Sequence, residues 1–151
     1  HRLELVRERN GVKWYNDSIA TAPERAIAAI RSFDEPLILL AGGRDKKLPW
    51  ADLMALARQR VKALIVFGEA ADLIARAAED ENARVKGRRY RRPPKLLNVV
   101  KCSSMAEAVQ KAAEIAEAGD VVLLSPGGTS YDAFRDFVER GERFREMANW
   151  L

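Results

Sequence analysis

The chain has 151 residues, 48% of them hydrophobic and 32% charged, and a formal net charge of +4 at pH 7. This length suits one domain whose core is large enough to be stable without disulfides or bound metal, and the single cysteine excludes an internal disulfide. No apolar run approaches the roughly 20 residues of a membrane span, and no signal-peptide pattern opens the chain. Composition therefore predicts a soluble protein of a reducing, cytoplasmic compartment. Because the chain begins with His1 rather than Met, we expect a segment of a longer polypeptide.

The first part of the chain predicts a β-hairpin followed by a helix. Residues 3–7 and 12–15 have strand patterns and flank Asn10-Gly11, a strong signal for a two-residue turn. Residues 21–24 (Thr-Ala-Pro-Glu) match a capping box with proline in the first turn, so a helix is expected from there to about residue 33.

From residue 37 onward, short apolar runs alternate with helical patterns. Strands are expected at 37–41, 63–68, 97–101 and 120–124, and helices from residue 50, at 70–78, at 104–117 and, as one or two helices around Gly141, at 131–150. This alternation predicts a Rossmann-like α/β fold, a mostly parallel sheet with helices on both faces, opened by the hairpin. Residues 1–151 are expected to form one domain.

Positive charge is concentrated in one segment. Residues 84–95 contain seven basic residues and no acidic one, whereas the rest of the chain holds 19 basic and 22 acidic residues. Because glycine and two prolines interrupt this segment, we interpret residues 82–96 as a solvated, mobile surface loop that tolerates deletion. An anion-binding or RNA-binding role is the alternative.

Several reaction classes lack their motifs. The chain has no Gly-x-Gly-x-x-Gly, which argues against an oxidoreductase, and no Gly-x-x-x-x-Gly-Lys-Ser/Thr phosphate loop. With one histidine and one cysteine it has neither a nucleophilic triad nor a metal cluster. We therefore expect no catalytic residue and no metal ligand in this chain, and any ATP must be held mainly elsewhere.

What remains are three loops, each following a predicted strand, and such strand ends face one crevice in a doubly wound sheet. The first loop carries Asp17, Ser18 and Thr21, and helix capping explains Thr21 and part of the case for the other two. Residues 42–47 form either a charged turn or a carboxylate or phosphate site. Residues 125–130 form either a glycine-rich connection or an anion cradle.

Four strings, in this order, resemble the C-terminal domain of the Mur ligase family, in its D-glutamate-adding branch. They are residues 1–4 (His-Arg-Leu-Glu), 16–21 (Asn-Asp-Ser-Ile-Ala-Thr), Gly42-Gly43 with Lys46, and 125–144, which begins Ser-Pro-Gly-Gly-Thr-Ser. The chain departs from the family pattern at Ile19, where a lysine is usual, and at 127–129, where Gly-Gly-Thr replaces Ala-Cys-Ala. Residues 82–96 resemble an insertion.

The resemblance implies a three-domain ligase that depends on ATP and Mg²⁺. In such enzymes the N-terminal domain binds the UDP-sugar and the central domain holds the ATP loop and magnesium ligands. A substrate carboxylate becomes an acyl phosphate, which the amine of D-glutamate attacks to form an amide. The third domain brings D-glutamate and closes over the nucleotide, so this chain alone is expected to be inactive. The implied partners are D-glutamate, ATP and, through the other domains, UDP-N-acetylmuramoyl-L-alanine, with no nucleic acid or membrane.

The resemblance also implies residue roles. For D-glutamate, the residues are Thr21 and Lys46 at the α-carboxylate and Ser130, Tyr131 and Phe137 at the side-chain carboxylate. For the nucleotide, they are Arg2, Asn16, Asp17 and Ser18. A sister ligase that adds another amino acid, or glutamates to folate, is the nearest alternative. The diaminopimelate- and lysine-adding branch, however, resembles an Asp-Tyr-Ala-His-x-Pro motif that is absent here. A nucleotide- or RNA-binding module is an alternative of another class.

Overall fold

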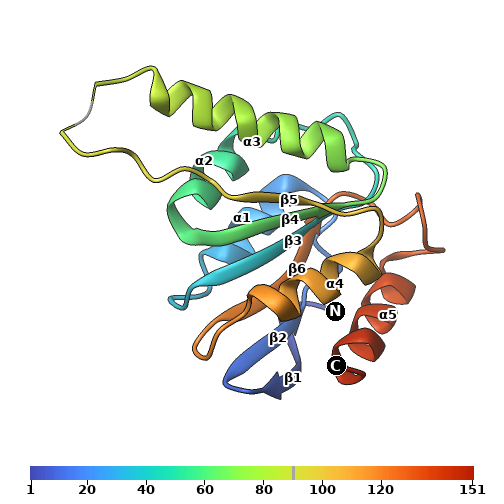
Figure 1. The fold of residues 1–151 in the computed structure, drawn as a ribbon. Coiled ribbons are helices and arrows are strands. Elements are labelled where there is room, and N and C mark those ends of the chain that lie inside the picture. Colours follow the sequence, from blue (N-terminus) through green and yellow to red (C-terminus); the bar gives the residue numbers. More distant parts are fainter. Residues whose placement is uncertain (90) are drawn as a thin grey trace.

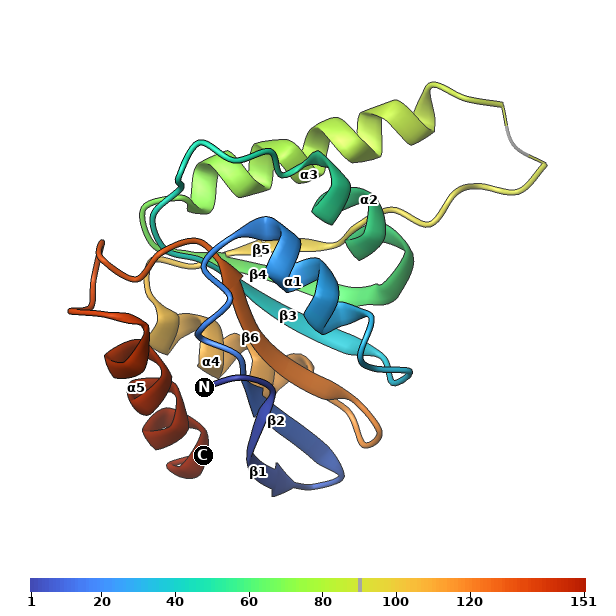
Figure 2. The same ribbon diagram turned by 180° about the vertical axis from the view of Figure 1, so that it is seen from behind.

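The computed structural model describes residues 1–89 and 91–151, and shows a six-stranded sheet with helices on both faces (Figures 1 and 2). The strands are β1 (Glu4–Arg9), β2 (Val12–Asn16), β3 (Leu37–Gly42), β4 (Val61–Phe67), β5 (Val99–Lys101) and β6 (Val121–Gly127). The helices are α1 (Pro23–Ile30), α2 (Ala51–Arg60), α3 (Ala71–Lys86), α4 (Met105–Ile115) and α5 (Phe137–Asn149). The predicted fold class is confirmed.

The strand order is β1-β2-β6-β3-β4-β5. Only β1 and β2 pair antiparallel, and each other neighbouring pair of these strands is parallel. Asn10 and Gly11 both have positive φ, 54° and 77°, as the tight turns of two-residue hairpins require. The hairpin prediction is confirmed.

Two separate cores hold the layers together. Helices α1, α2 and α3 pack on one face of the sheet, against side chains such as Leu39, Leu64 and Leu123. Helices α4 and α5 pack on the other face, where Leu40 and Ile65 lie. Because both faces are covered, the parallel strands are apolar along their whole length, which is why they read as continuous runs in the sequence.

The start of α1 differs from the prediction. Its N-cap is Ala22, in extended conformation, and no side chain caps the helix, so the capping box at residues 21–24 is wrong. Thr21 lies one residue too early, and Pro23 already occupies the first turn. The helix also ends at Ile30 rather than near residue 33. By contrast, the Ser104 hydroxyl caps α4 by accepting the Glu107 amide at 3.2 Å, as predicted.

The last helix is shorter than predicted. Residues 131–136 form a turn, and a single helix, α5, begins at Phe137 with Asp136 as its N-cap. Gly141 lies inside this helix rather than breaking it. A side chain there would place its Cβ 2.3 Å from Nδ1 of His1 and 2.8 Å from Nδ2 of Asn16, so a larger residue would have to displace these two side chains.

The basic segment begins later than predicted, because α3 continues to Lys86. Val85 is only 1% exposed and extends the buried stripe of Ile74 and Ala78 at helical spacing. Asn82 then fixes the returning chain: its amide donates to the Leu97 carbonyl at 3.1 Å, and its oxygen accepts the Leu97 N–H at 2.8 Å. We call residues 87–89 and 91–95 the basic arm. It extends beyond the end of α3 in both views (Figures 1 and 2).

The end of α3 at Lys86 and the burial of Val85 predict different effects for two deletions. Replacing residues 88–94 by a short glycine-serine linker should leave the melting temperature within about 2 °C of wild type, because none of the described residues in this range contributes to either core. Removing residues 84–95 also removes buried Val85, and should cost roughly 1–3 kcal/mol of the free energy of unfolding. Thermal unfolding of both variants checks this, and equal effects would contradict the boundary at Lys86.

Candidate ligand site at the carboxyl edge of the sheet

The sheet has a switch point between β3 and β6. The chain leaves β3 toward α2 on one face and leaves β6 toward α5 on the other. In open α/β sheets, ligands bind where neighbouring strands diverge in this way. The two loops are joined there, since the Arg44 N–H donates to the Thr129 carbonyl at 2.8 Å and the Thr129 N–H donates to the Arg44 carbonyl at 2.9 Å. The second and third predicted loops therefore form one surface.

The glycines at this edge allow backbone to pack on backbone. Gly43 has a φ of +98°, and a Cβ there would lie 2.1 Å from the Thr129 carbonyl oxygen. A Cβ on Gly128 would lie 2.6 Å from the Gly42 oxygen. These glycines therefore bring the two loops together, and their approach to a ligand stays a prediction.

A buried arginine ties the edge together. Arg140, on α5, is 0% exposed. Its Nη1 donates to the Gly128 carbonyl at 3.0 Å, its Nε to the Ser18 hydroxyl at 2.9 Å and its Nη2 to the Ser18 carbonyl at 2.8 Å. Burial lowers the pKa of Arg140 to about 10, although the nearby Asp132 carboxylate acts in the opposite direction. The guanidinium is still charged at neutral pH, and it links α5 to the loops after β2 and β6.

Arg140 lies within the fourth motif, residues 125–144, but the motif by itself assigns no role to it. The signal was nevertheless present. Phe137, Arg140, Phe144 and Ala148 recur at helical spacing, so the arginine lies on the inward stripe of an amphipathic helix. A charged residue on such a stripe needs buried partners.

Asn16 and Ser18, two of the predicted nucleotide residues, point into this network. The Asn16 side-chain amide donates to Glu4 Oε1 at 3.1 Å and lies 3.0 Å from Nδ1 of His1, while its oxygen accepts the Ser18 N–H at 3.1 Å. The Ser18 hydroxyl donates to the Phe137 carbonyl at 2.7 Å. These two residues position the loop after β2, and their contact with a nucleotide stays a prediction.

The other two nucleotide residues share a cavity. Arg2 and Asp17 line a hollow of about 250 Å³, together with Arg25 and Ser32 of the α1 region. One Asp17 oxygen accepts the Leu3 N–H at 3.1 Å and the other accepts the Ser125 hydroxyl at 2.8 Å. Burial raises the pKa of Asp17, and the hydrogen bond from Ser125 opposes the rise.

This shift predicts how stability varies with pH. The folded-state pKa of Asp17 lies above the ordinary aspartate pKa, so the protonated side chain stabilises the folded state relative to the ionised one. This contribution to the free energy of unfolding is fully present below the ordinary aspartate pKa. It is lost as the pH rises through the raised value. Between about pH 3 and pH 7, the free energy of unfolding of wild type should therefore fall relative to that of Asp17→Asn. Urea titrations of both proteins check this. A trend of opposite sign would contradict the assignment.

Lys46 stands in the loop that follows β3. Two side-chain contacts brace this loop: Trp50 Nε1 donates to Asp45 Oδ1 at 3.0 Å, and Arg44 Nε donates to Glu69 Oε2 at 3.0 Å. Lys46 itself is exposed and forms no ion pair with any described residue. Its ammonium group is therefore available to an anion. Thr21 is half-buried, and its hydroxyl is not used to cap α1.

The three remaining predicted D-glutamate residues lie at the two ends of the turn before α5. Ser130 is buried, and its carbonyl accepts the Phe134 N–H at 2.8 Å. Tyr131 is 63% exposed, whereas Phe137 is half-buried with its ring edge-to-face to the imidazole of His1 at a centroid distance of 6.0 Å. Since Ser130 directly follows the paired Thr129, the Lys46 loop and this turn are neighbours.

Among residues 1–89 and 91–151, no group of three or more His, Cys, Asp or Glu side chains is placed to hold a metal ion. Within the same residues, no helix has both the length and the apolar character needed to cross a membrane.

A family model described as "Mur ligase, glutamate ligase domain" matches residues 1–128. The chain belongs to this family. The resemblance found in the four sequence strings is therefore confirmed.

Two curated relatives of this Mur ligase domain are D-glutamate ligases. UDP-N-acetylmuramoylalanine–D-glutamate ligase of Acetivibrio thermocellus is 48% identical over 149 residues, 99% of this chain and 31% of that protein. The same ligase of Ruminiclostridium cellulolyticum is 41% identical over 151 residues, again 31% of its length. The chain thus spans about a third of these relatives. They give no support to a sister ligase or an RNA-binding module.

Solved structures share the fold at low identity. A murein peptide ligase from Psychrobacter arcticus superposes with a TM-score of 0.63 at 14% identity, covering 98% of this chain and 30% of its own. A UDP-N-acetylmuramoyl-L-alanyl-D-glutamate–2,6-diaminopimelate ligase gives 0.59 at 18% identity, covering 99% and 31%. These likenesses show that the Mur ligase domain shares its fold with a part of each of these ligases.

Proposed function

We propose that this domain delivers D-glutamate in an ATP-dependent ligase that joins it to UDP-N-acetylmuramoyl-L-alanine, and that it contributes part of the nucleotide site. The observation that carries the proposal is the pairing of Arg44 with Thr129, which sets the Lys46 loop beside the Ser130 turn at the switch point. The 41–48% identity to D-glutamate ligases supports the choice of amino acid.

The residues suit a dicarboxylic amino acid. Lys46 and Thr21 would hold the α-carboxylate, while Ser130, Tyr131 and Phe137 would hold the side-chain carboxylate through hydroxyl and backbone groups. A dicarboxylate that leaves water needs a cation and several hydrogen-bond donors, and each charge-assisted hydrogen bond is worth roughly 1.5–3 kcal/mol. The amine of D-glutamate is left unbound by this set, and so free to act as the nucleophile.

The cavity beside Asp17 suits a nucleotide. Arg2 and Arg25 line it with cations that can pair with phosphate, and Asp17 and Ser32 add polar groups. ATP supplies the phosphoryl group that activates the carboxylate. Asn16 and Ser18 would act on the nucleotide side by holding the loop that carries Asp17. Following the family resemblance, we assign Mg²⁺ and the phosphate loop to other parts of the polypeptide.

We further propose that residues 1–151 form one domain, the third of a ligase that works in the bacterial cytoplasm. The coverage of 31% of the curated relatives supports a longer polypeptide. The UDP-sugar would then bind through the other domains.

This proposal predicts that the 151-residue chain folds but neither hydrolyses ATP nor forms an amide. ADP release should be measured with Mg²⁺, D-glutamate and UDP-N-acetylmuramoyl-L-alanine, for the chain alone and for the full-length protein. We expect turnover from the full-length protein and none above background from the chain. Magnesium-dependent ATP turnover by the pure chain would contradict the assignment of the phosphate loop to other domains.

A further inference from the structure

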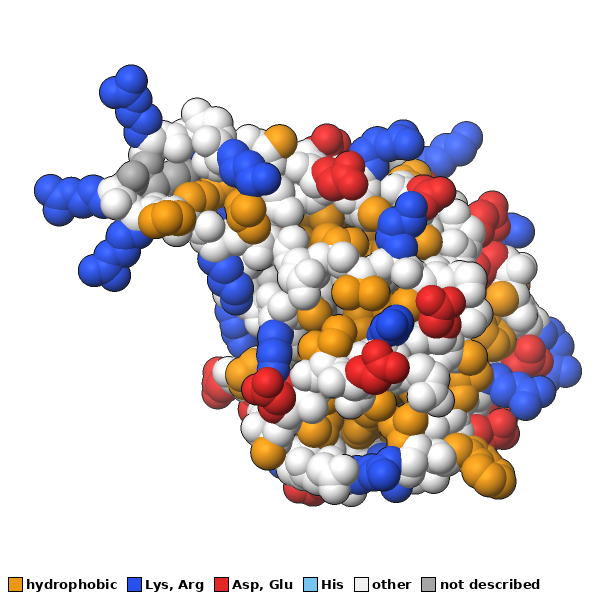
Figure 3. All heavy atoms as spheres, in the orientation of Figure 1, with side chains coloured by type: hydrophobic (Ala, Val, Ile, Leu, Met, Phe, Trp, Pro, Cys, Tyr) orange, Lys and Arg blue, Asp and Glu red, His pale blue; other side chains and the backbone are white. Residues whose placement is uncertain are grey.

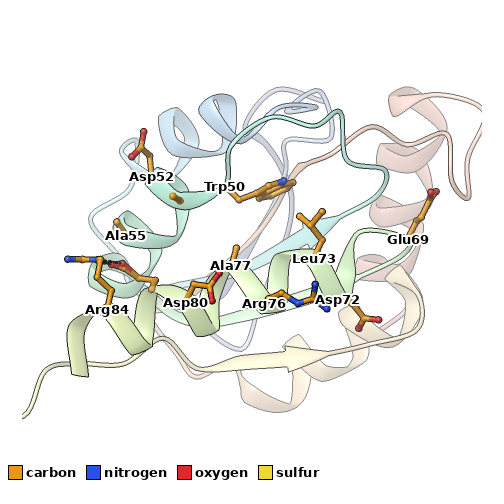
Figure 4. Close-up of a pocket in the computed structure, with 12 residues that line it drawn as sticks. Trp50, Asp52, Ala55, Glu69, Asp72, Leu73, Arg76, Ala77, Asp80 and Arg84 are labelled. Atoms are coloured by element: carbon orange, nitrogen blue, oxygen red, sulfur yellow. Dashed lines mark hydrogen bonds and ion pairs between the residues drawn. The ribbon is translucent and has the colours of Figure 1, made fainter. Parts of the chain in front are cut away.

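A second hollow lies away from the ligand site, between α2 and α3. Its volume is about 820 Å³, and no residue assigned to D-glutamate or the nucleotide lines it. In Figure 4, Leu73 and Ala77 point from α3 toward α2 and Trp50, so the floor of the groove is apolar. Leu73 is 42% exposed although large and hydrophobic.

The rim of this groove is acidic. Five of its lining residues are acidic and two are basic. Glu69, Asp72 and Glu81 are paired with Arg44, Lys101 and Arg84, whereas the carboxylates of Asp52 and Asp80 are exposed and form no ion pair with any described residue. An apolar floor with an acidic rim favours an extended segment that carries basic side chains. The segment should also have few backbone N–H groups, because an apolar floor offers them no hydrogen-bond acceptors.

The basic arm has these properties. Its cations, Arg88, Arg89, Arg91, Arg92 and Lys95, are exposed and form no side-chain ion pair within the part of the chain that the structure describes. Figure 3 shows Lys and Arg side chains spreading outward from this projection. The arm also contains Pro93-Pro94, which favours an extended conformation without backbone donors.

The arm cannot serve the ligand site or its own groove. It connects α3 to β5, and therefore leaves from the amino edge of the parallel sheet, opposite the ligand site. It also runs onward from the end of α3, away from the groove, in both views (Figures 1 and 2). The Lys95 carbonyl, which accepts from Arg58 Nη1 at 3.3 Å, fixes its returning end.

We propose that the basic arm of one copy binds in the α2–α3 groove of a second copy, and that the exchange is reciprocal. Outside residues 84–95 the chain has more acidic than basic residues, so arm and body attract between copies. A two-fold axis lets both copies use the same pair of surfaces, and two grooves are then filled at once. This inference does not depend on the proposed function.

The test is the mass of the chain in solution. Sedimentation equilibrium should show reversible dimers of the 16.9 kDa chain at about 20 mM NaCl. The dissociation constant should rise at least tenfold by about 300 mM NaCl, because exposed charges are then screened. A monomer at every concentration and salt would overturn the proposal.

Charge reversal locates the contact. Arg88→Glu/Arg89→Glu/Arg91→Glu in the arm and Asp52→Lys/Asp80→Lys in the groove should each abolish the dimer. An equimolar mixture of the two variants should restore a 1:1 heterodimer, because both exchanges are then complementary. Glu8→Lys/Glu142→Lys, with exposed charges elsewhere, should dimerise like wild type. Failure of the mixture to associate, or equal loss in the control, would overturn the proposal.

Discussion

Replacing Lys46 by alanine in the full-length ligase is expected to lower kcat/KM for D-glutamate about 30- to 1000-fold. The change removes the one cation that we assign to D-glutamate and leaves a carboxylate poorly paired, at a cost of roughly 2–4 kcal/mol of transition-state stabilisation. The constants for ATP and for UDP-N-acetylmuramoyl-L-alanine should change far less, because we assign those sites chiefly to other domains. Steady-state kinetics with each substrate varied in turn measures the difference.

Lys47 is the matched control. It is also exposed and follows Lys46 directly, but its backbone has a φ of +61°, which turns the chain at this residue. Lys47→Ala should be nearly silent for all three substrates. Equal, small effects of both substitutions would make the loop after β3 a simple charged turn and would remove the D-glutamate assignment.

Replacing Arg140 by methionine is expected to lower the free energy of unfolding of the 151-residue chain by about 3–5 kcal/mol. Methionine leaves the carbonyls of Ser18 and Gly128 and the Ser18 hydroxyl without their buried donor. The melting temperature should fall by roughly 6–20 °C for a chain of this length. Urea unfolding and thermal scans check both figures.

Two variants frame that result. Arg140→Lys keeps the charge but loses the planar fork that reaches three acceptors, so we expect an intermediate loss. Arg143→Met, one turn further along α5, removes only an exposed contact with Glu146 at 3.3 Å and should cost less than about 1 kcal/mol. If Arg140→Met were as mild as Arg143→Met, the guanidinium would not hold these loops together.

The local features of the fold were predictable because their signals are local. The Asn10-Gly11 turn and the continuous apolar runs of β3 and β4 depend on residues near in sequence, and each was found where expected. The order of the parallel strands was not predictable in this way. That β6 lies between β2 and β3 is decided by packing between distant segments.

The errors in helix boundaries also have physical causes. The inward stripe of α3 continues to Val85, but the many charged residues on its outer faces hid that stripe in the sequence. At α1, the hydroxyl of Thr21 suggested a cap, yet the helix begins at Pro23 and needs no side-chain cap. Capping patterns identify the neighbourhood of a helix start but not the residue that takes the N-cap conformation.

The motifs indicated the candidate site, but not the hydrogen bonds within it. Asp17 and Arg2 were predicted together, and they line one cavity. Asn16 and Ser18 come from the same motif, but their polar groups face Glu4 and Arg140 rather than open space. The sequence cannot distinguish a side chain that faces a ligand from one that supports the loop, because polar residues of the same motif can serve either purpose.

The amino-acid specificity of the full-length protein tests the central claim most directly. With ATP, Mg²⁺ and UDP-N-acetylmuramoyl-L-alanine held saturating, kcat/KM should be measured for D-glutamate, L-glutamate, L-lysine and meso-diaminopimelate. We predict that D-glutamate is preferred over each of the others by at least about 100-fold. L-lysine lacks the second carboxylate, whereas L-glutamate and meso-diaminopimelate carry two carboxylates that differ from those of D-glutamate in configuration or spacing relative to the reacting amine. Equal or better use of another amino acid would contradict the assignment of this domain as a D-glutamate carrier.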